Sequence, residues 1–139
     1  MQTPTPKRCV LLAVFLLFGV GARPCVVVAA DKKLHFEDAV MCEGVRELAP
    51  INRAVVFSMA IGRVSCFSSF DRVPRQTFIY HRWYHQDALS TKKKLFLKPP
   101  SWSTYSSIQL READKGPWRV EITDEKGTLF AILRFSVTD

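Results

Sequence analysis

The chain has 139 residues, and its 20 lysines and arginines against 13 aspartates and glutamates give a formal net charge of +7 and a pI near 9.5. This length fits one domain, and a hydrophobic fraction of 47% with a charged fraction of 24% excludes wholesale disorder. The basic residues are unevenly placed, because the first thirty residues hold three of them and no acidic residue.

The first thirty residues have the pattern of a secretory signal. Lys7 and Arg8 form a basic start, and an apolar run follows at residues 9–20. Small residues at 28–30 provide the pattern that signal peptidase cleaves. An Arg-Pro pair interrupts the apolar stretch, so neither half reaches the roughly 20 residues that a membrane span needs. We therefore predict a signal peptide at residues 1–30, with a retained N-terminal anchor as the alternative.

Cleavage after residue 30 would change the composition of the protein. Residues 31–139 hold 17 basic against 13 acidic residues, a net charge of +4, and two of the four cysteines. In an exported domain, the remaining Cys42 and Cys66 predict one disulfide, and the alternative is two unpaired buried thiols. Neither cysteine lies in a cluster typical of a metal site.

The region after the leader is rich in short β-type runs separated by turn residues. No stretch keeps a helical period with caps at both ends. Trp118, Val120 and Ile122 alternate with polar residues, and Gly127 in the following turn predicts a β-hairpin with the next run. The predicted strands are residues 36–43, 61–70, 75–85, 90–97, 104–110, 117–124 and 128–137.

These strands predict the fold class. Seven short strands over about 100 residues are typical of an all-β, immunoglobulin-like antiparallel β-sandwich, and a small β-barrel is the alternative. Pro50 and Asn52 predict a loop at residues 47–59. We expect residues 31–139 to form a single domain.

Five segments in this region carry a family resemblance. They are Cys42–Pro50, Gly62–Phe67, His81–His85, Trp102–Ser107 and Gly116–Ile122. In this order and spacing, from about residue 35 to 138, the chain resembles a bacterial envelope family known as domain of unknown function 2914. The resemblance implies a small all-β exported domain, and it supplies no activity and no catalytic residues.

The polar residues form no catalytic or metal-binding pattern. His81 and His85 would share a helix face, but on a strand they lie about 13 Å apart, too far to bind one ion. The serines between residues 101 and 107 lack a GxSxG motif, and no glycine-rich phosphate loop is present. We therefore expect no enzyme, no metal and no cofactor, with Trp83 packed in the core.

Aromatic residues provide the candidate binding surface. Tyr80, Arg82 and Tyr84 share the strand face opposite Trp83, while Trp102 and Tyr105 follow a Pro-Pro loop. Such rings can stack on sugars or on an apolar patch of a partner, and the alternative is that they complete a small core. The candidate residues are Tyr80, Arg82, Tyr84, Trp102 and Tyr105.

Lys92–Lys94, with Lys98, form the main basic cluster. On a strand Lys93 points opposite to its neighbours, which suits a charged edge strand that discourages aggregation. The alternative is that the cluster binds anions of the envelope, such as lipid head groups, phosphates or acidic glycans. A net charge of +4 without a recognisable module predicts no nucleic-acid binding.

These observations together predict an exported non-catalytic domain of the cell envelope, periplasmic or secreted. We expect it to bind a protein partner or act as a scaffold, through a sheet edge or through the strand around residues 80–84. The alternative is a module that binds glycan or cell wall with its exposed aromatics. Membrane contact is expected only through an uncleaved leader.

Overall fold

The computed structural model of the chain describes residues 33–139. The predicted signal peptide, its cleavage site and the alternative anchor lie outside these residues. No helix within the described part of the chain is long and apolar enough to cross a membrane.

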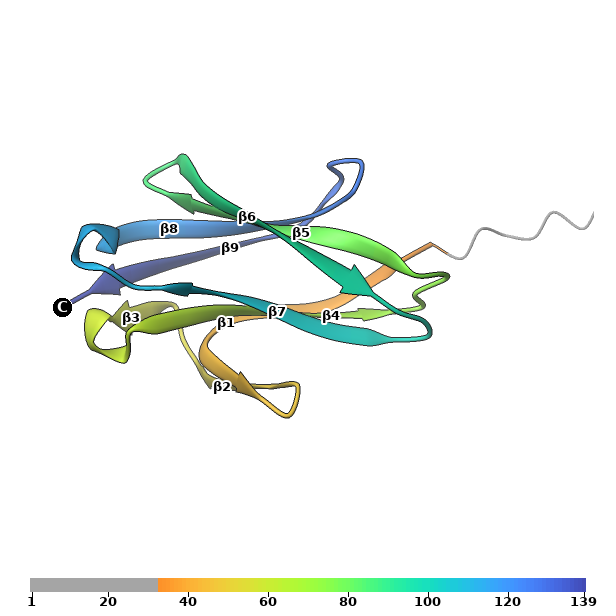
Figure 1. Cartoon of the computed structure of the whole chain (residues 1–139), viewed down its shortest axis with the longest axis horizontal. Coiled ribbons are helices and arrows are strands. Elements are labelled where there is room, and N and C mark those ends of the chain that lie inside the picture. Colours follow the sequence, from red (N-terminus) through yellow and green to blue (C-terminus); the bar gives the residue numbers. More distant parts are fainter. Residues whose placement is uncertain (1–32) are drawn as a thin grey trace, which may run out of the picture. The chain divides into compact units, whose positions relative to one another are not determined.

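The described residues form two β-sheets that pack face to face (Figure 1). One sheet has four strands in the order β2-β1-β4-β7, and the other has five in the order β3-β9-β8-β5-β6. The elements are β1 (His35–Arg46), β2 (Ala49–Arg53), β3 (Val56–Ser58), the 3-10 turn η1 (Met59–Ile61), β4 (Arg63–Asp71), β5 (Thr77–His85), β6 (Ala88–Leu97), β7 (Trp102–Gln109), η2 (Glu112–Asp114), β8 (Gly116–Asp124) and β9 (Leu129–Thr138).

The strand order is that of an immunoglobulin-like sandwich. Strands β1, β4 and β7 lie opposite β9, β8, β5 and β6, in the arrangement of strands A-B-E against G-F-C-C′. All neighbouring strands are antiparallel except β3, which runs parallel to β9. The predicted sandwich is confirmed, and each of the seven predicted strands is present, with β2 and β3 in addition. The β-barrel alternative is wrong, because both sheets have open edges.

The predicted loop at residues 47–59 is wrong, because this segment contains β2 and β3. Glu47 and Leu48 both adopt positive φ, at 50° and 56°, which a tight type I′ turn requires. This turn folds β2 back onto β1. Pro50 is compatible with a strand here because β2 is an edge strand, where the missing N–H removes no internal hydrogen bond.

The core lies between the sheets, and Trp83 is at its centre. Its fully buried indole packs edge-on against Phe135, with ring centroids 6.0 Å apart and an interplanar angle of 84°. Phe135 is also stacked on Trp118, again at 6.0 Å. The prediction that Trp83 packs in the core is confirmed.

The predicted disulfide between Cys42 and Cys66 is absent from the structure, in which both residues are buried free thiols. The pairing of β1 with β4 places Cys66 opposite Met41, and Cys42 opposite Ser65. Because successive side chains alternate between sheet faces, the two sulfurs point to opposite faces and cannot bond. Burial raises the pKa of both thiols. The structure matches the alternative of two unpaired buried thiols.

Candidate binding face

The outer face of the five-stranded sheet combines aromatic and basic side chains. Along β5, residues 78, 80, 82 and 84 point away from the core because the intervening residues 79, 81 and 83 are fully buried. Their neighbours on β6, β8 and β9 point the same way. We call this surface the aromatic–cationic face, formed by Phe78, Tyr80, Arg82, Tyr84, Lys92, Lys94, Phe96, Arg119, Glu121 and Arg134.

Cations lie directly over the rings of this face. The Lys92 Nζ atom is 3.9 Å from the centroid of the Tyr80 ring, and the Arg119 guanidinium carbon is 4.1 Å from that of Tyr84. The Lys94 Nζ atom is 4.0 Å from the centroid of Phe78. The antiparallel register creates these pairs, since Arg119 lies directly opposite Tyr84, while Lys92 and Lys94 are diagonal neighbours of the rings that they cover. Cation–π attraction therefore orders the lysines and holds the rings in place.

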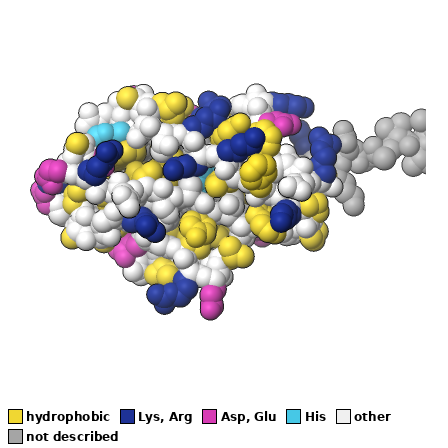
Figure 2. All heavy atoms as spheres, in the orientation of Figure 1, with side chains coloured by type: hydrophobic (Ala, Val, Ile, Leu, Met, Phe, Trp, Pro, Cys, Tyr) yellow, Lys and Arg dark blue, Asp and Glu magenta, His cyan; other side chains and the backbone are white. Residues whose placement is uncertain are grey.

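Positive charge exceeds negative charge on the face. Five of its residues are basic, and Glu121 is the acidic one. The Glu121 carboxylate accepts a hydrogen bond of 3.1 Å from Arg119 Nε, and this bond raises the pKa of Arg119. Figure 2 looks onto the side of the sandwich where β6 and β7 lie, with the five-stranded sheet above, and shows Lys and Arg side chains among hydrophobic ones. An acidic surface is therefore the complementary ligand.

Arg82 lies at the centre of this face without an anionic partner. It is opposite Lys92 on β6 and opposite Glu121 on β8. Its Nε atom is buried and has no hydrogen-bond partner, and no ion pair among residues 33–139 includes Arg82 or Lys92. A buried donor without an acceptor costs free energy. Because no carboxylate among the described residues pairs with Arg82, its half-buried guanidinium can donate to a carboxylate of a partner.

The structure brings three of the five predicted binding residues together and separates the other two. Tyr80, Arg82 and Tyr84 lie on the aromatic–cationic face. Tyr105 lies on β7 in the other sheet, and it points outward because the next residue bonds to His81 in the core. Trp102 begins β7, where the Lys98 Nζ atom is 5.6 Å from its ring centroid. The five candidate residues therefore lie on two different sheets.

Sequence reasoning missed the basic partners of the rings. The sequence predicts edge protection for Lys92 and Lys94 and indicates no role for Arg119. The alternation of the chain indicated which way each side chain points. The pairing of β5 with both β6 and β8 places the cations over the rings. This pairing depends on the register between strands, which the alternation of a single strand does not predict.

His81 belongs to a buried hydrogen-bond network. Its Nε2 atom is 3.0 Å from Ser68 Oγ and its Nδ1 atom is 2.8 Å from Ser106 Oγ. Trp83 Nε1 also donates to Ser106 Oγ, at 3.0 Å. Burial lowers the pKa of His81 to about 3, so the imidazole is neutral near pH 7. This network satisfies buried polar groups between the two sheets.

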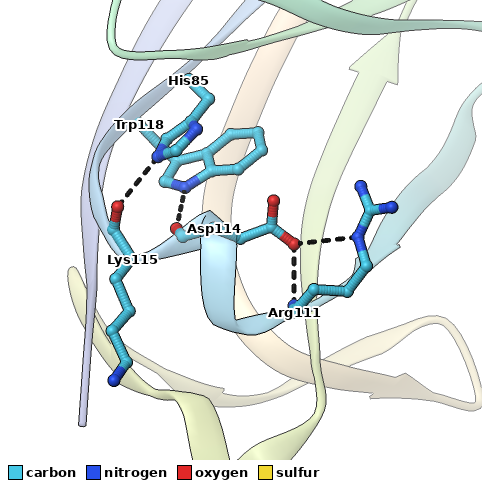
Figure 3. A network of polar contacts seen from close by, with 5 residues as sticks. All are labelled: His85, Arg111, Asp114, Lys115 and Trp118. Carbon is cyan, nitrogen blue, oxygen red and sulfur yellow. Dashed lines mark hydrogen bonds and ion pairs between the residues drawn. The ribbon is translucent and has the colours of Figure 1, made fainter.

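His85 belongs to a separate network at the start of β8 (Figure 3). Its ring stacks on Trp118 with centroids 4.5 Å apart, and its Nε2 atom is 2.9 Å from the Lys115 carbonyl oxygen. Trp118 Nε1 donates to the Asp114 carbonyl at 2.7 Å, while the Asp114 carboxylate accepts from the Arg111 backbone N–H at 2.7 Å. These bonds fix the turn η2 between β7 and β8.

The two histidines therefore serve different structural networks. In the part of the chain that the structure describes, no group of three His, Cys, Asp or Glu residues could hold a metal ion.

The fold and the aromatic–cationic face together define a small immunoglobulin-like β-sandwich domain with a candidate docking surface. Residues 76–137 match the model of the family described as protein of unknown function (DUF2914). This match confirms the predicted resemblance to domain of unknown function 2914 over these residues. It covers β5 to β9, which carry the whole aromatic–cationic face, and three of the five resembling segments. No match to a curated protein was found.

Proposed function

We propose that the protein is an exported non-catalytic domain of the cell envelope that binds an acidic protein partner through the aromatic–cationic face. The observation that carries the proposal is the unpaired Arg82 guanidinium at the centre of that face, between Tyr80 and Tyr84. Tyrosine and arginine are the residue types most often found at energetic hot spots of protein interfaces. The predicted leader and the family resemblance support the envelope location.

A broad sheet face suits a protein better than a small molecule. The side chains from residue 78 to residue 84 span about 20 Å along β5, at roughly 3.4 Å per residue. Apolar residues continue the surface on both sides, with Phe96 and Leu89 each 55% exposed and Ile132 42% exposed. Rings and aliphatic side chains of this kind form interface cores, and the charged residues around Arg82 form the polar rim.

Substitution of Arg82 by glutamine is expected to abolish partner capture. The amide keeps hydrogen-bonding capacity but loses the charge and the fork that binds a carboxylate. In cross-linking of intact cells followed by mass spectrometry, we expect the yield of the cross-linked partner to fall at least about tenfold, which corresponds to about 1.4 kcal/mol. Tyr84→Ala is expected to have a similar effect.

Arg46→Gln provides the matched control for this experiment. Arg46 is an exposed arginine at the end of β1 in the other sheet, so its removal changes the net charge equally. Thermal unfolding of each purified variant confirms that it is folded. If folded Arg82→Gln and Tyr84→Ala proteins keep every cross-link of the unmodified protein, the proposed docking face is wrong.

The alternative function is glycan or cell-wall binding, and the exposed rings of the four-stranded sheet favour it. Tyr105 is 45% exposed and Trp102 is 37% exposed. Stacking of a sugar on an aromatic ring depends little on salt, whereas binding through lysines weakens as salt screens the charges. The glycan alternative predicts co-sedimentation with purified cell wall that persists in 1 M salt, where charges interact over about 3 Å rather than about 10 Å as at 0.1 M. Tyr105→Ala is expected to abolish this co-sedimentation. Loss of co-sedimentation in high salt would reject it.

A further inference from the structure

A basic groove separates the edges of the two sheets where β6 and β7 diverge. Two cavities, of about 470 Å³ and about 400 Å³, lie in this region. They share four lining residues and therefore form one continuous groove. The shared residues are Lys93, Ser107, Ile108 and Gln109. Except for Lys94, no residue of the aromatic–cationic face lines the groove, so the two surfaces are distinct.

A free strand edge borders the groove on each side. β6 is the last strand of the five-stranded sheet, and β7 is the last strand of the four-stranded sheet (Figure 1). One side of β6 pairs with β5 along its whole length, from Ala88 to Leu97. Its other side pairs with no strand among the described residues, so that a row of backbone N–H and C=O groups faces the groove. Such an edge can accept an additional strand.

The charges around this edge are strongly unbalanced. Lys93 is exposed at the mouth of the sandwich, and Arg63 and Arg111 line the same groove. With Lys94, the lining holds four basic residues against one carboxylate, that of Asp114. That carboxylate accepts a hydrogen bond from the Arg111 backbone N–H and forms an ion pair with Arg111 Nε at 3.4 Å, which leaves Arg63, Lys93 and Lys94 without a carboxylate in the groove lining. An occupant of the groove is therefore expected to be anionic.

Three consecutive lysines place positive charge on both faces of the β6 edge. Lys93 points towards the groove, whereas Lys92 and Lys94 point to the aromatic–cationic face, where they lie over Tyr80 and Phe78. Edge protection alone would account for these lysines. It would not account for Arg63 and Arg111, which lie outside β6 and face the same space.

We propose that this groove binds an extended acidic segment of a protein partner, which adds to the free edge of β6 as an extra strand. The backbone of the segment bonds to the edge. Carboxylates on the face of the segment that lies over the groove reach Lys93 and Arg63. This site goes beyond the proposed function, because it lies on an edge rather than on a sheet face and requires an extended ligand.

A fluorescein-labelled decapeptide of alternating glutamate and valine tests the site by fluorescence anisotropy with the full-length protein. We expect binding that Lys93→Glu weakens at least about tenfold through charge reversal, and Lys93→Gln by a smaller factor. Lys126→Glu provides the matched control, since Lys126 lies in the turn between β8 and β9 and lines neither groove cavity. Its effect is expected to be within about twofold, as for a rim charge.

Backbone pairing is tested with peptides that carry N-methyl groups on every second amide, in both possible phases. Because alternate amides of a strand face the same neighbour, we expect one phase to lose binding and the other to keep it. Equal binding of both phases, or no binding of the parent peptide, would overturn the proposal. The proposal would also be overturned if dextran sulfate bound as tightly as the peptide and with the same dependence on Lys93. Tyr84→Ala is expected to leave peptide binding unchanged, so this proposal and the proposed function can fail separately.

Discussion

Replacement of Trp83 by alanine is expected to lower the free energy of unfolding by about 3–5 kcal/mol, the range for removal of a buried tryptophan or phenylalanine ring. Trp83 is fully buried and packs against Phe135, so its loss leaves a cavity between the sheets. It also removes the N–H that donates to Ser106 Oγ. Because a domain is stable by only about 5–15 kcal/mol, this variant is expected to unfold at a much lower urea concentration.

Two further variants separate packing from hydrogen bonding at this position. Trp83→Phe keeps an aromatic ring but lacks the N–H, and it is expected to cost less than the alanine variant, about 1–3 kcal/mol. Trp102→Ala removes a partly exposed indole and is expected to cost about 1 kcal/mol or less. Equal urea midpoints for Trp83→Ala and Trp102→Ala would contradict the central place of Trp83 in the core.

Acid is expected to destabilise the domain through His81. In the folded protein burial lowers its pKa to about 3, whereas in the unfolded chain its pKa is near the ordinary 6.5. The unfolded state therefore binds a proton that the folded state does not bind. The stability that the neutral imidazole contributes is fully present above about pH 6.5 and is lost as the pH falls towards 3, by roughly 5 kcal/mol in total.

Urea denaturation between pH 7 and pH 3.5 checks this result in the unmodified protein and in two histidine variants. His81→Gln places an amide between Ser68 and Ser106 that does not titrate, so its stability is expected to fall less steeply over this range. His35→Gln removes an exposed histidine and is expected to follow the unmodified protein. If the curves of His81→Gln and the unmodified protein run parallel, His81 does not control the acid response.

Alternating residues predicted most of the fold. The run Trp118, Val120, Ile122 and the glycine turn after it correctly indicated the hairpin of β8 and β9, and the same period indicated β5 and β6. The turn before β2 was missed because Glu47 and Leu48 rarely adopt positive φ, and nothing in their side chains marks such a turn. Here tertiary pairing with β1 overrides the local preference of the chain.

The candidate site was predictable to the extent that it depends on one strand. Alternation along β5 placed Tyr80, Arg82 and Tyr84 on one face. Alternation does not indicate to which sheet a strand belongs, so the sequence alone does not separate Tyr105 from the three residues of β5. The disulfide prediction failed for a related reason, because it depends on the register of β1 with β4. The two cysteines are one residue out of register, so their side chains lie on opposite faces of the sheet.

The parallel pairing of β3 with β9 determines when the sandwich can be completed. Val56 pairs with Ser136, 80 positions further along the chain, so this contact closes a loop that contains every strand from β4 to β8. Contacts between such distant residues form slowly, because the entropy of closing the loop must be lost before they stabilise the chain. A growing chain therefore leaves β3 without its neighbour until synthesis reaches the last strand. Completion of the five-stranded sheet is consequently a late event of folding.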